Sequence, residues 1–515
     1  MLLVLMLAIM ISGGFEWQIS TLKVRMHSLR NPFRVFLLFV ILKIWSERKA
    51  KQPGILEQIE ALLANRYGRG ALMAVACLLF VWIKLSQHYT FRTGAFDLAM
   101  YDSALSNTLK GRFMYTPWLG RSYFSEHFAP ILLLLLPFYL IYDNPIVLMI
   151  VQAVAVVLAV FPLYKLAKEY FAASLIPLCL VVVYLNYRYV LRGFMFDFHH
   201  EIFEPFLVFS VFLYLRQQAT TKYFLFLILA LACKEDMPIY MAMLGGYACL
   251  VEKKRRLGIA TIVITIVWAV VAWKIIIPLS FPDGVQPSRF LVRWSQYGQT
   301  YTQIAWNLLM HPSELCGTAL KNARELLAPL GFVPVASPGT LLLALPPLLL
   351  NSTSAFDLQM NLQAHYALPI VPFLFIALLI GLHHLCAWFP RQRQALLTVV
   401  SVYLLVMNVS SLKAFPITNH DLVGHRLLKT LPDGVTIAAQ TSFVPHLRRS
   451  QHIRLLPYDL TTDYVLFDTQ RFIWPMTAKE YQATLRQFLE NGQYQLVIRE
   501  EGFYLFRKFE IHLIY

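Results

Sequence analysis

Carboxylate, imidazole and tyrosine side chains recur in short segments that interrupt strongly apolar sequence. In the first, GAFDLAMYDSALSNTLKGR, Tyr101 follows Asp97 by four residues and Asp102 follows it by five. Helical spacing puts Asp97 and Tyr101 on one face, with Asp102 about 140° away from Asp97. A carboxylate here could act as general base towards an acceptor hydroxyl, or hold a divalent metal that neutralises a phosphate leaving group. A solvated loop helix that caps itself explains the same acids without any chemistry, and both interpretations stay open.

The second segment is RGFMFDFHHEIFEPF. Asp197, His200, Glu201 and Glu204 follow an i, i+3, i+4, i+7 pattern, which predicts one helical face carrying acids and an imidazole. Like charges packed this way repel unless a cation or a shared proton lies among them. The alternative is a first helical turn, where acids are favoured by the dipole, and Asp197 fits such a cap. His200 and Glu201 lie deeper in the apolar run, which favours a functional role for them.

The third segment holds Lys234, Glu235 and Asp236 just before Pro238, and could be only an internally neutralised turn. Other candidate groups lie near the ends of apolar runs: His127, Arg188, Arg192, His199, His365 and Tyr366. A single histidine at a membrane surface is more often structural than a ligand. These groups suggest a functional site because all of them are expected on one side of a membrane.

The composition identifies the elements that must position these residues. Of 515 residues, 58% are apolar and 14% charged, with a mean hydropathy of +0.55, whereas soluble chains have roughly 45–50% apolar and about 25% charged residues. Uninterrupted runs such as ILLLLLPFYLIY lack the alternation of a β-barrel. The predicted fold is therefore an all-α polytopic membrane protein with about 11–13 transmembrane helices.

Basic residues give the predicted topology. The net charge of +16 gathers in short loops beside apolar runs, as in cytoplasmic loops, so no nucleic-acid partner is expected. The segments KLAKEY, RQQATTK, EKKRR and PRQRQ are assigned to the cytoplasm. The predicted spans are 71–87, 145–163, 173–190, 202–216, 221–233, 237–251, 258–280, 322–337, 340–351, 369–388 and 395–413. Residues 131–142 are too short to cross and are expected to be half-inserted or juxtamembrane.

The sequence divides the chain into three regions. Residues 1–69 are expected to hold a retained anchor at 1–11 and an interfacial segment at 35–45. Residues 70–413 form the transmembrane domain, with outer loops 88–130 and 281–321. Residues 414–515 are expected to form a small extracytoplasmic α/β domain, since VTIAAQ, DYVLFDT and QLVIREEGFYLF are typical of strands and KEYQATLRQFLEN of a helix. Six scattered cysteines suggest neither disulfides nor zinc, and no phosphate-binding loop is present.

Several motifs, in order, resemble one bacterial membrane protein family, catalogued as domain of unknown function 2079, over about residues 70 to 510. These motifs are FDLAMYDSALSNT, SEHFAPILLLLLPFY, FDFHHEIFEPF, KEDMP, LGFVPVASP with LALPPLLLN, HYALPIVPFLF and VPHL. The family is similar to C-type (GT-C fold) glycosyltransferases, which move a sugar from a polyprenyl-phosphate carrier. The resemblance implies a catalytic acid at Asp97, or at Asp102, and a second acid at Asp197 or Glu201. The first loop lacks the paired acids DxD or ExD of that superfamily, which leaves metal dependence open.

The sequence therefore predicts an inner-membrane hexosyl- or pentosyltransferase that uses a polyprenyl-phosphate sugar and an extracytoplasmic glycan, lipid or protein acceptor. Asp97 would deprotonate the acceptor hydroxyl, and Lys234, Arg192, Arg188 and His365 would face the anionic head of the donor lipid. Any Mg²⁺ or Mn²⁺ would be held by Asp97, Asp197, His200 and Glu201. The alternatives are a transporter or flippase of a lipid-linked or anionic solute, and a non-catalytic envelope assembly protein.

Overall fold

The structure is a computed structural model of the chain. It describes residues 15–19, 22–26, 62, 65–172, 175–281, 289–409, 412–449, 451–457, 460–471, 473–490 and 492–509. Strands β1 (Phe15–Ile19) and β2 (Leu22–Met26) pair antiparallel. The expected anchor at 1–11 and the interfacial segment at 35–45 lie outside the described residues.

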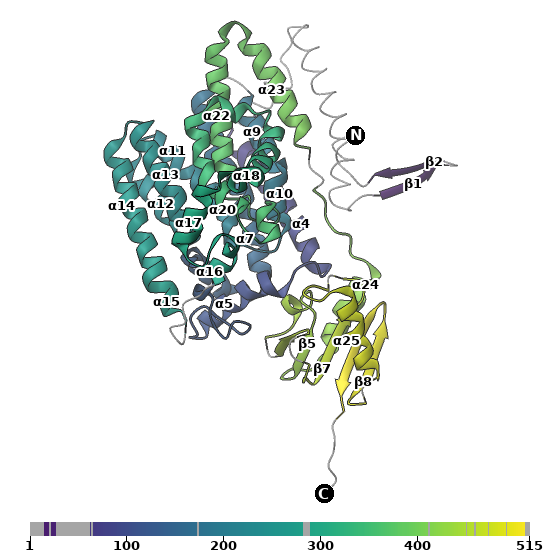
Figure 1. Cartoon of the computed structure of the whole chain (residues 1–515). Helices are drawn as coiled ribbons and strands as arrows, with labels where there is room; N and C mark the ends of the chain where they lie inside the picture. The colour runs from purple at the N-terminus through teal and green to yellow at the C-terminus, as the bar shows by residue number, and fades with distance from the viewer. Residues whose placement is uncertain are drawn as a thin grey trace.

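Helices between residues 66 and 407 form a bundle, and a small sheet domain lies at one end of it (Figure 1). The helices are α4 (Arg66–Tyr89), α5 (Met100–Leu109), α6 (Leu136–Ile141), α7 (Ile146–Leu158), α8 (Val160–Tyr170), α9 (Ile176–Asn186), α10 (Arg188–Met195), α11 (Glu204–Arg216), α12 (Thr220–Leu231), α13 (Met237–Leu250), α14 (Arg255–Val271), α15 (Ile277–Leu279), α16 (Arg289–Val292), α17 (Tyr301–Met310), α18 (Pro312–Leu327), α19 (Pro338–Leu341), α20 (Leu345–Ser352), α21 (Asp357–Met360), α22 (Val371–Trp388) and α23 (Arg393–Met407). A π-helical turn, η1 (Ala95–Ala99), leads into α5, and a 3-10 turn, η4 (His200–Phe203), leads into α11.

The prediction of a mostly helical, multi-span membrane protein is confirmed. Among the described residues, four helices are long and apolar enough to cross a membrane, at 66–89, 146–170, 255–279 and 371–388, and the bent pair α9 and α10 makes up to five. Helices α12 and α13 have 12 and 14 residues. At about 1.5 Å per residue such helices fall short of a hydrocarbon core of about 30 Å. Among the described residues, helices of full length therefore account for four or five of the expected 11–13 spans.

One predicted span, 322–337, is wrong. Helix α18 ends at Leu327, and two 3-10 turns follow, at Ala328–Leu330 and Val333–Ala336. Pro329 and Pro334 lack the N–H that a helix needs, and Gly331 has a φ of 62°. Residues 131–142, in contrast, form the short turn and helix Pro130–Leu135 and α6, in agreement with a segment that does not cross.

The basic segments share one end of the bundle. The Arg216 guanidinium is 3.0 Å from Glu252 and lies over the Tyr170 ring, at 5.4 Å. The Tyr170 ring also contacts His383, with centroids 5.2 Å apart, near the end of α22. The turn between α22 and α23 lies at the opposite end from the C-terminal sheet (Figure 1). The four segments assigned to the cytoplasm therefore lie away from the C-terminal domain; which side of a membrane each end faces stays a prediction.

The C-terminal domain has a five-stranded mixed sheet of order β6-β5-β7-β9-β8. Its elements are α24 (Asn419–Thr430), β5 (Thr436–Ala439), β6 (His452–Leu455), β7 (Tyr464–Asp468), α25 (Ala478–Glu490), β8 (Tyr494–Glu500) and β9 (Phe503–Lys508). Strand β5 is parallel to β6 and β7, and β9 is antiparallel to β7 and β8. The predicted strands and the helix at 479–491 are confirmed, whereas β6 and α24 were not expected.

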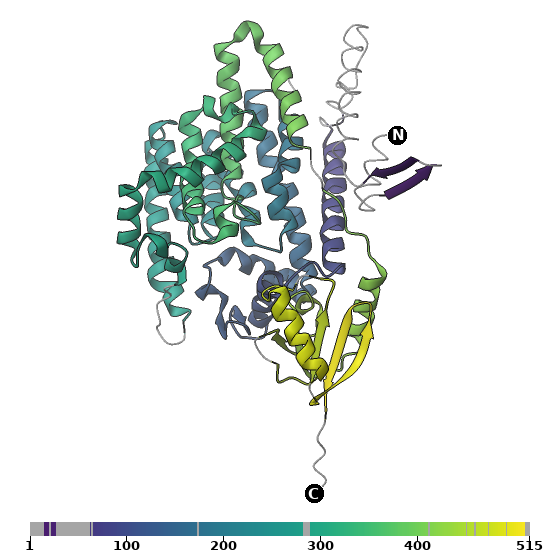
Figure 2. The same ribbon diagram turned by 45° about the vertical axis from the view of Figure 1, so that its right-hand side comes forward.

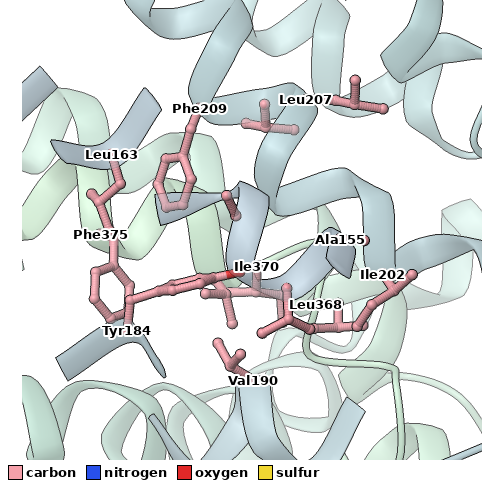
Figure 3. Packing of buried hydrophobic residues seen from close by; sticks show 14 of the residues in the cluster. Ala155, Leu163, Tyr184, Val190, Ile202, Leu207, Phe209, Leu368, Ile370 and Phe375 are labelled. Carbon is pink, nitrogen blue, oxygen red and sulfur yellow. The ribbon is translucent and has the colours of Figure 1, made fainter. Parts of the chain in front are cut away.

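A buried apolar cluster fixes the segments that carry the polar residues (Figure 3). Ile202 and Leu368, each 1% exposed, pack there with Val190 and Phe209. Ile202 follows Glu201 directly and Leu368 lies three residues after His365, so this packing also sets the positions of those two polar side chains. An added Cβ at Gly193 would come within 2.7 Å of Leu368, which shows how closely the chains approach.

The C-terminal domain lies against one end of the bundle (Figure 2). The two share both apolar and ionic contacts. Phe91, 1% exposed, packs into the apolar core of the domain beside Phe443. The Arg449 guanidinium donates to both oxygens of Asp102, at 2.7 Å each, and to Asp143 at 2.7 Å. Burial raises the pKa of Asp102 and Arg449 opposes that rise.

Replacing Arg449 with Met is expected to destabilise the protein by about 2–3 kcal/mol. The variant leaves the buried Asp102 carboxylate without its cation, and the loss is smaller than the ~3–5 kcal/mol of a fully buried pair because Arg449 is partly exposed. The matched control is Arg426→Met, which removes an exposed pair with Glu500 and should change stability by less than about 1 kcal/mol. The measurement is unfolding of the full chain in detergent, and equal losses in the two variants would contradict this role for Arg449.

Candidate functional site

Six polar side chains from four separate stretches of the chain lie together at the end of the bundle nearest the C-terminal domain. We refer to them as the histidine–carboxylate cluster, which consists of Asp97, His199, His200, Glu201, Lys234 and His365. The turn η1, the segment 196–203, the turn before α13 and the turn before α22 supply them.

Two histidine rings connect the carboxylates of the cluster. The Nε2 atom of His199 is 3.2 Å from Asp97 Oδ1. The His199 and His365 rings are stacked with centroids 3.7 Å apart, and His365 Nε2 is 3.5 Å from Glu201 Oε1. Burial alone lowers the pKa of His199, but the Asp97 carboxylate raises it above its usual value. Asp97 is 31% exposed, against 10% for His199 and 2% for Glu201, so the cluster reaches solvent at Asp97.

Lys234 neutralises the buried acids. Its Nζ is 2.8 Å from Glu201 Oε1 and 3.7 Å from Asp236 Oδ2, and Asp236 also accepts a hydrogen bond from Tyr240 at 3.0 Å. Unpaired charges at such depth would be strongly unfavourable, so the expectation that a cation lies among the acids is fulfilled by Lys234. Glu204 is fully buried, and its two carboxylate oxygens have no hydrogen-bond partner among the described residues.

Two tyrosine hydroxyls form a hydrogen-bonded chain that ends at His200. The Tyr123 hydroxyl donates to Tyr101 at 2.9 Å, and the Tyr101 oxygen is 3.1 Å from His200 Nδ1. Beside them, His127 Nδ1 is 2.8 Å from Glu235. Asp97 and Tyr101 thus face the same cluster, as their helical spacing predicts. Tyr123 was not expected, and nothing in the sequence around it marks it.

Asp197 holds the backbone that carries Asp97. Its Oδ2 accepts a hydrogen bond from the Gly94 N–H at 2.7 Å. Lys84, from α4, donates to the carbonyl oxygens of Phe194, at 2.8 Å, and Phe196. Burial and the nearby Asp97 raise the pKa of Asp197 to about 7, and Lys84 opposes that rise. Lys84 was missed by the sequence analysis, although a lysine inside an apolar span is a recognisable signal.

The expectation of one helical face from Asp197 to Glu204 is wrong. Phe196 has φ −74° and ψ 165°, and His199 has φ −140° and ψ 144°, so this stretch is extended. Helical structure begins only at His200, in η4. The extended backbone turns Asp197 towards Gly94 and allows His199, which lies outside the helical pattern, to contact Asp97.

Several predicted site residues lie elsewhere or have other partners. Asp102 faces Arg449 and accepts from Tyr139 at 3.0 Å, on the other side of α5 from Tyr101. Arg188 is 3.0 Å from Glu325, and Arg192 lies over the Tyr189 ring at 5.2 Å. The Tyr366 ring is 4.2 Å from that of His365, so Tyr366 borders the cluster.

Asp97, Asp197, His200 and Glu201, the residues named as holders of any metal ion, are not arranged as a metal site. In the described part of the chain, no group of three or more His, Cys, Asp or Glu side chains is arranged to hold a metal ion. Asp197 is turned to the Gly94 N–H, His200 to the Tyr101 hydroxyl, and Glu201 to Lys234. These residues therefore do not fit Mg²⁺ or Mn²⁺ as a group.

The fold is that of an integral multi-span membrane protein with a C-terminal mixed sheet. It is similar to the crystal structure of ArnT from Cupriavidus metallidurans bound to undecaprenyl phosphate, with a TM-score of 0.54 and 13% identity, over 86% of this chain and 98% of that chain. At this identity the similarity shows the fold alone. The chain belongs to the family described as predicted membrane protein (DUF2079), whose model matches residues 87–505. No curated protein matches the sequence.

Asp197→Asn is expected to change how stability depends on pH. A pKa of about 7 in the folded protein, against a usual value of 3.8, means that the folded state holds an extra proton between these values. Asp197 therefore lowers stability progressively as the pH rises through this window. The melting temperature of the variant minus that of wild type should therefore increase by roughly 1–2 °C between pH 5 and pH 8.

The matched control for this experiment is Asp463→Asn. Hydrogen bonds from Thr436 lower the pKa of Asp463, so its carboxylate is ionised throughout this window and its difference from wild type should stay constant. A constant difference for Asp197→Asn as well would show that Asp197 does not titrate there.

Proposed function

We propose that this protein is a GT-C-type glycosyltransferase of the bacterial inner membrane, and that it transfers a sugar from a polyprenyl-phosphate donor to an extracytoplasmic glycan, lipid or protein. The observation that carries the proposal is the partly exposed Asp97 carboxylate, held 3.2 Å from His199 at the edge of a buried ionic cluster. The fold, which is similar to that of ArnT, supports the same reaction class.

In the proposed reaction, Asp97 takes the proton of the acceptor hydroxyl. The hydroxyl oxygen attacks the anomeric carbon of the donor sugar, and the bond from that carbon to the phosphate oxygen breaks. The electron pair leaves with the polyprenyl phosphate. His199 acts as a positioning residue, because its Nε2 contact with Asp97 fixes the carboxylate. The nearby Asp97 raises the pKa of His199, which favours the charged imidazolium.

The donor would need a cationic partner for its phosphate and an apolar surface for its lipid chain. Lys234 is already neutralised by Glu201, whereas Arg192 has no ion-pair partner among the described residues, so we assign the phosphate to Arg192. An apolar cavity of about 320 Å³ lies between α18, α20 and α22, lined by Leu326, Leu345, Ile370 and Leu374 among others. Ile370 is five residues from His365, so this cavity is a candidate site for part of the isoprenoid chain.

Asp97→Asn is expected to lower transfer by about 10²–10⁴-fold, because it removes the general base. The assay uses purified protein, a panel of polyprenyl-phosphate sugars and added acceptors, and it measures released polyprenyl phosphate. The matched control is Asp357→Asn, an exposed acid of the same bundle whose carboxylate accepts a bond from Asn361, and it should keep wild-type activity.

Two results would contradict the proposal. The first is wild-type protein that neither binds nor turns over any donor, and the second is equal activity of Asp97→Asn and wild type. Movement of an unchanged lipid-linked substrate across proteoliposomes would instead favour a transporter or flippase. Intact function of Asp97→Asn and Glu201→Gln in cells would favour an assembly protein.

A further inference from the structure

A large cavity lies between the bundle and the C-terminal domain, apart from the histidine–carboxylate cluster. Its volume is about 760 Å³, and its walls come from the end of α4, from α5 and the loop after it, from the start of α7, and from the residues between α24 and β6. Figure 2 shows the C-terminal domain against this end of the bundle. Helix α5 separates the two regions, since Tyr101 contacts His200 whereas Asp102 faces the cavity.

The lining of the cavity is strongly basic. Six cationic side chains contribute to it: Lys110, Arg112, Lys429, Arg448, Arg449 and Arg454. Among the described residues of the lining, the acids are Asp102 and Asp143, and the Arg449 guanidinium donates a hydrogen bond to each of them. Lys110 also lies 3.8 Å from Asp143, and Arg448 pairs with Asp433, outside the lining, at 3.1 Å. Six cations against two acids leave the described lining with a net positive charge. An excess of one charge sign in a cleft concentrates ligands of the opposite sign.

Hydrogen-bond donors accompany the charge. The His446 ring is buried in the wall, stacked on His88 with centroids 4.1 Å apart, and its Nε2 atom has no hydrogen-bond partner among the described residues. A buried polar atom without a partner is uncommon, and this one belongs to a residue of the cavity wall. Lys110 and Lys429 come from opposite walls, one from the end of α5 and the other from the last turn of α24.

We propose that this cavity binds a phosphate-bearing headgroup. Oxyanions of a phosphate ester match lysine and arginine donors on facing walls, and the cavity is large enough for a phosphate with an attached glycerol or sugar. The bound group bridges the bundle and the C-terminal domain, because its cationic partners belong to both. The inference is independent of glycosyl transfer, since it concerns binding by residues on the far side of α5 from Asp97.

The test measures binding to the full-length protein in nanodiscs of neutral phosphatidylcholine. One arm titrates inorganic phosphate by calorimetry. The other arm replaces part of the lipid with phosphatidic acid and measures retained lipid by native mass spectrometry. Saturable binding in the lipid arm alone identifies a membrane headgroup, and competition by inorganic phosphate identifies a site for free phosphate as well; both support the proposal.

The variant Lys110→Gln with Lys429→Gln should weaken binding at least tenfold, because it removes a cation from each wall. The control, Arg426→Gln with Lys479→Gln, removes the same charge from exposed positions outside the lining and should stay within twofold of wild type. Absence of saturable binding in both arms of the wild-type experiment would overturn the proposal. An equal loss in the two double variants would also overturn it, because binding would then follow net charge and not this cavity.

Discussion

The structure depends on the pairing of charges that are removed from water. Glu201 is 2% exposed and Lys234 13% exposed, and their side chains meet at 2.8 Å. In surroundings of low dielectric constant, either charge alone would be strongly unfavourable, so each fixes the position of the other. The same constraint joins Asp97 to His199 and, through the stacked His365 ring, links the segment after α4 to residues far along the chain. Burial therefore accounts for the ion pairs of the cluster. The proposed catalytic residue is Asp97, the more exposed of its two acids.

The C-terminal domain contributes to the position of that acid. Thr441 Oγ1 accepts a hydrogen bond from the Ala95 N–H at 2.8 Å, and Asp197 holds the adjacent Gly94 N–H. An added Cβ at Gly94 would lie 3.0 Å from Thr441 Oγ1, so the absence of a side chain at Gly94 allows the two segments to approach this closely. The turn that carries Asp97 is therefore held from both sides, by the bundle and by the sheet domain. Arg449 and Phe91 reinforce the same junction with ionic and apolar contacts.

The sequence predicted the class of fold and most of the cluster, but not its contacts. Hydropathy and basic loops revealed the helical bundle and which segments share an end, because these depend on local composition. They did not reveal the break after Leu327, because an average over many residues is insensitive to individual prolines and a glycine. The partners Thr441 and Arg449 lie more than 300 positions from Ala95 and Asp102, so only tertiary packing shows them. Asp102, which the sequence offers as an alternative to Asp97, pairs with Arg449.

The central claim is that Asp97 and His199 act as one catalytic unit. A double-mutant cycle on kcat/KM tests it most directly, with Asp97→Asn, His199→Gln and the combined variant assayed on the same donor and acceptor. Groups that act together give strongly non-additive effects. The account predicts that the combined variant is no slower than Asp97→Asn alone. Independent, multiplying losses in the combined variant would contradict it.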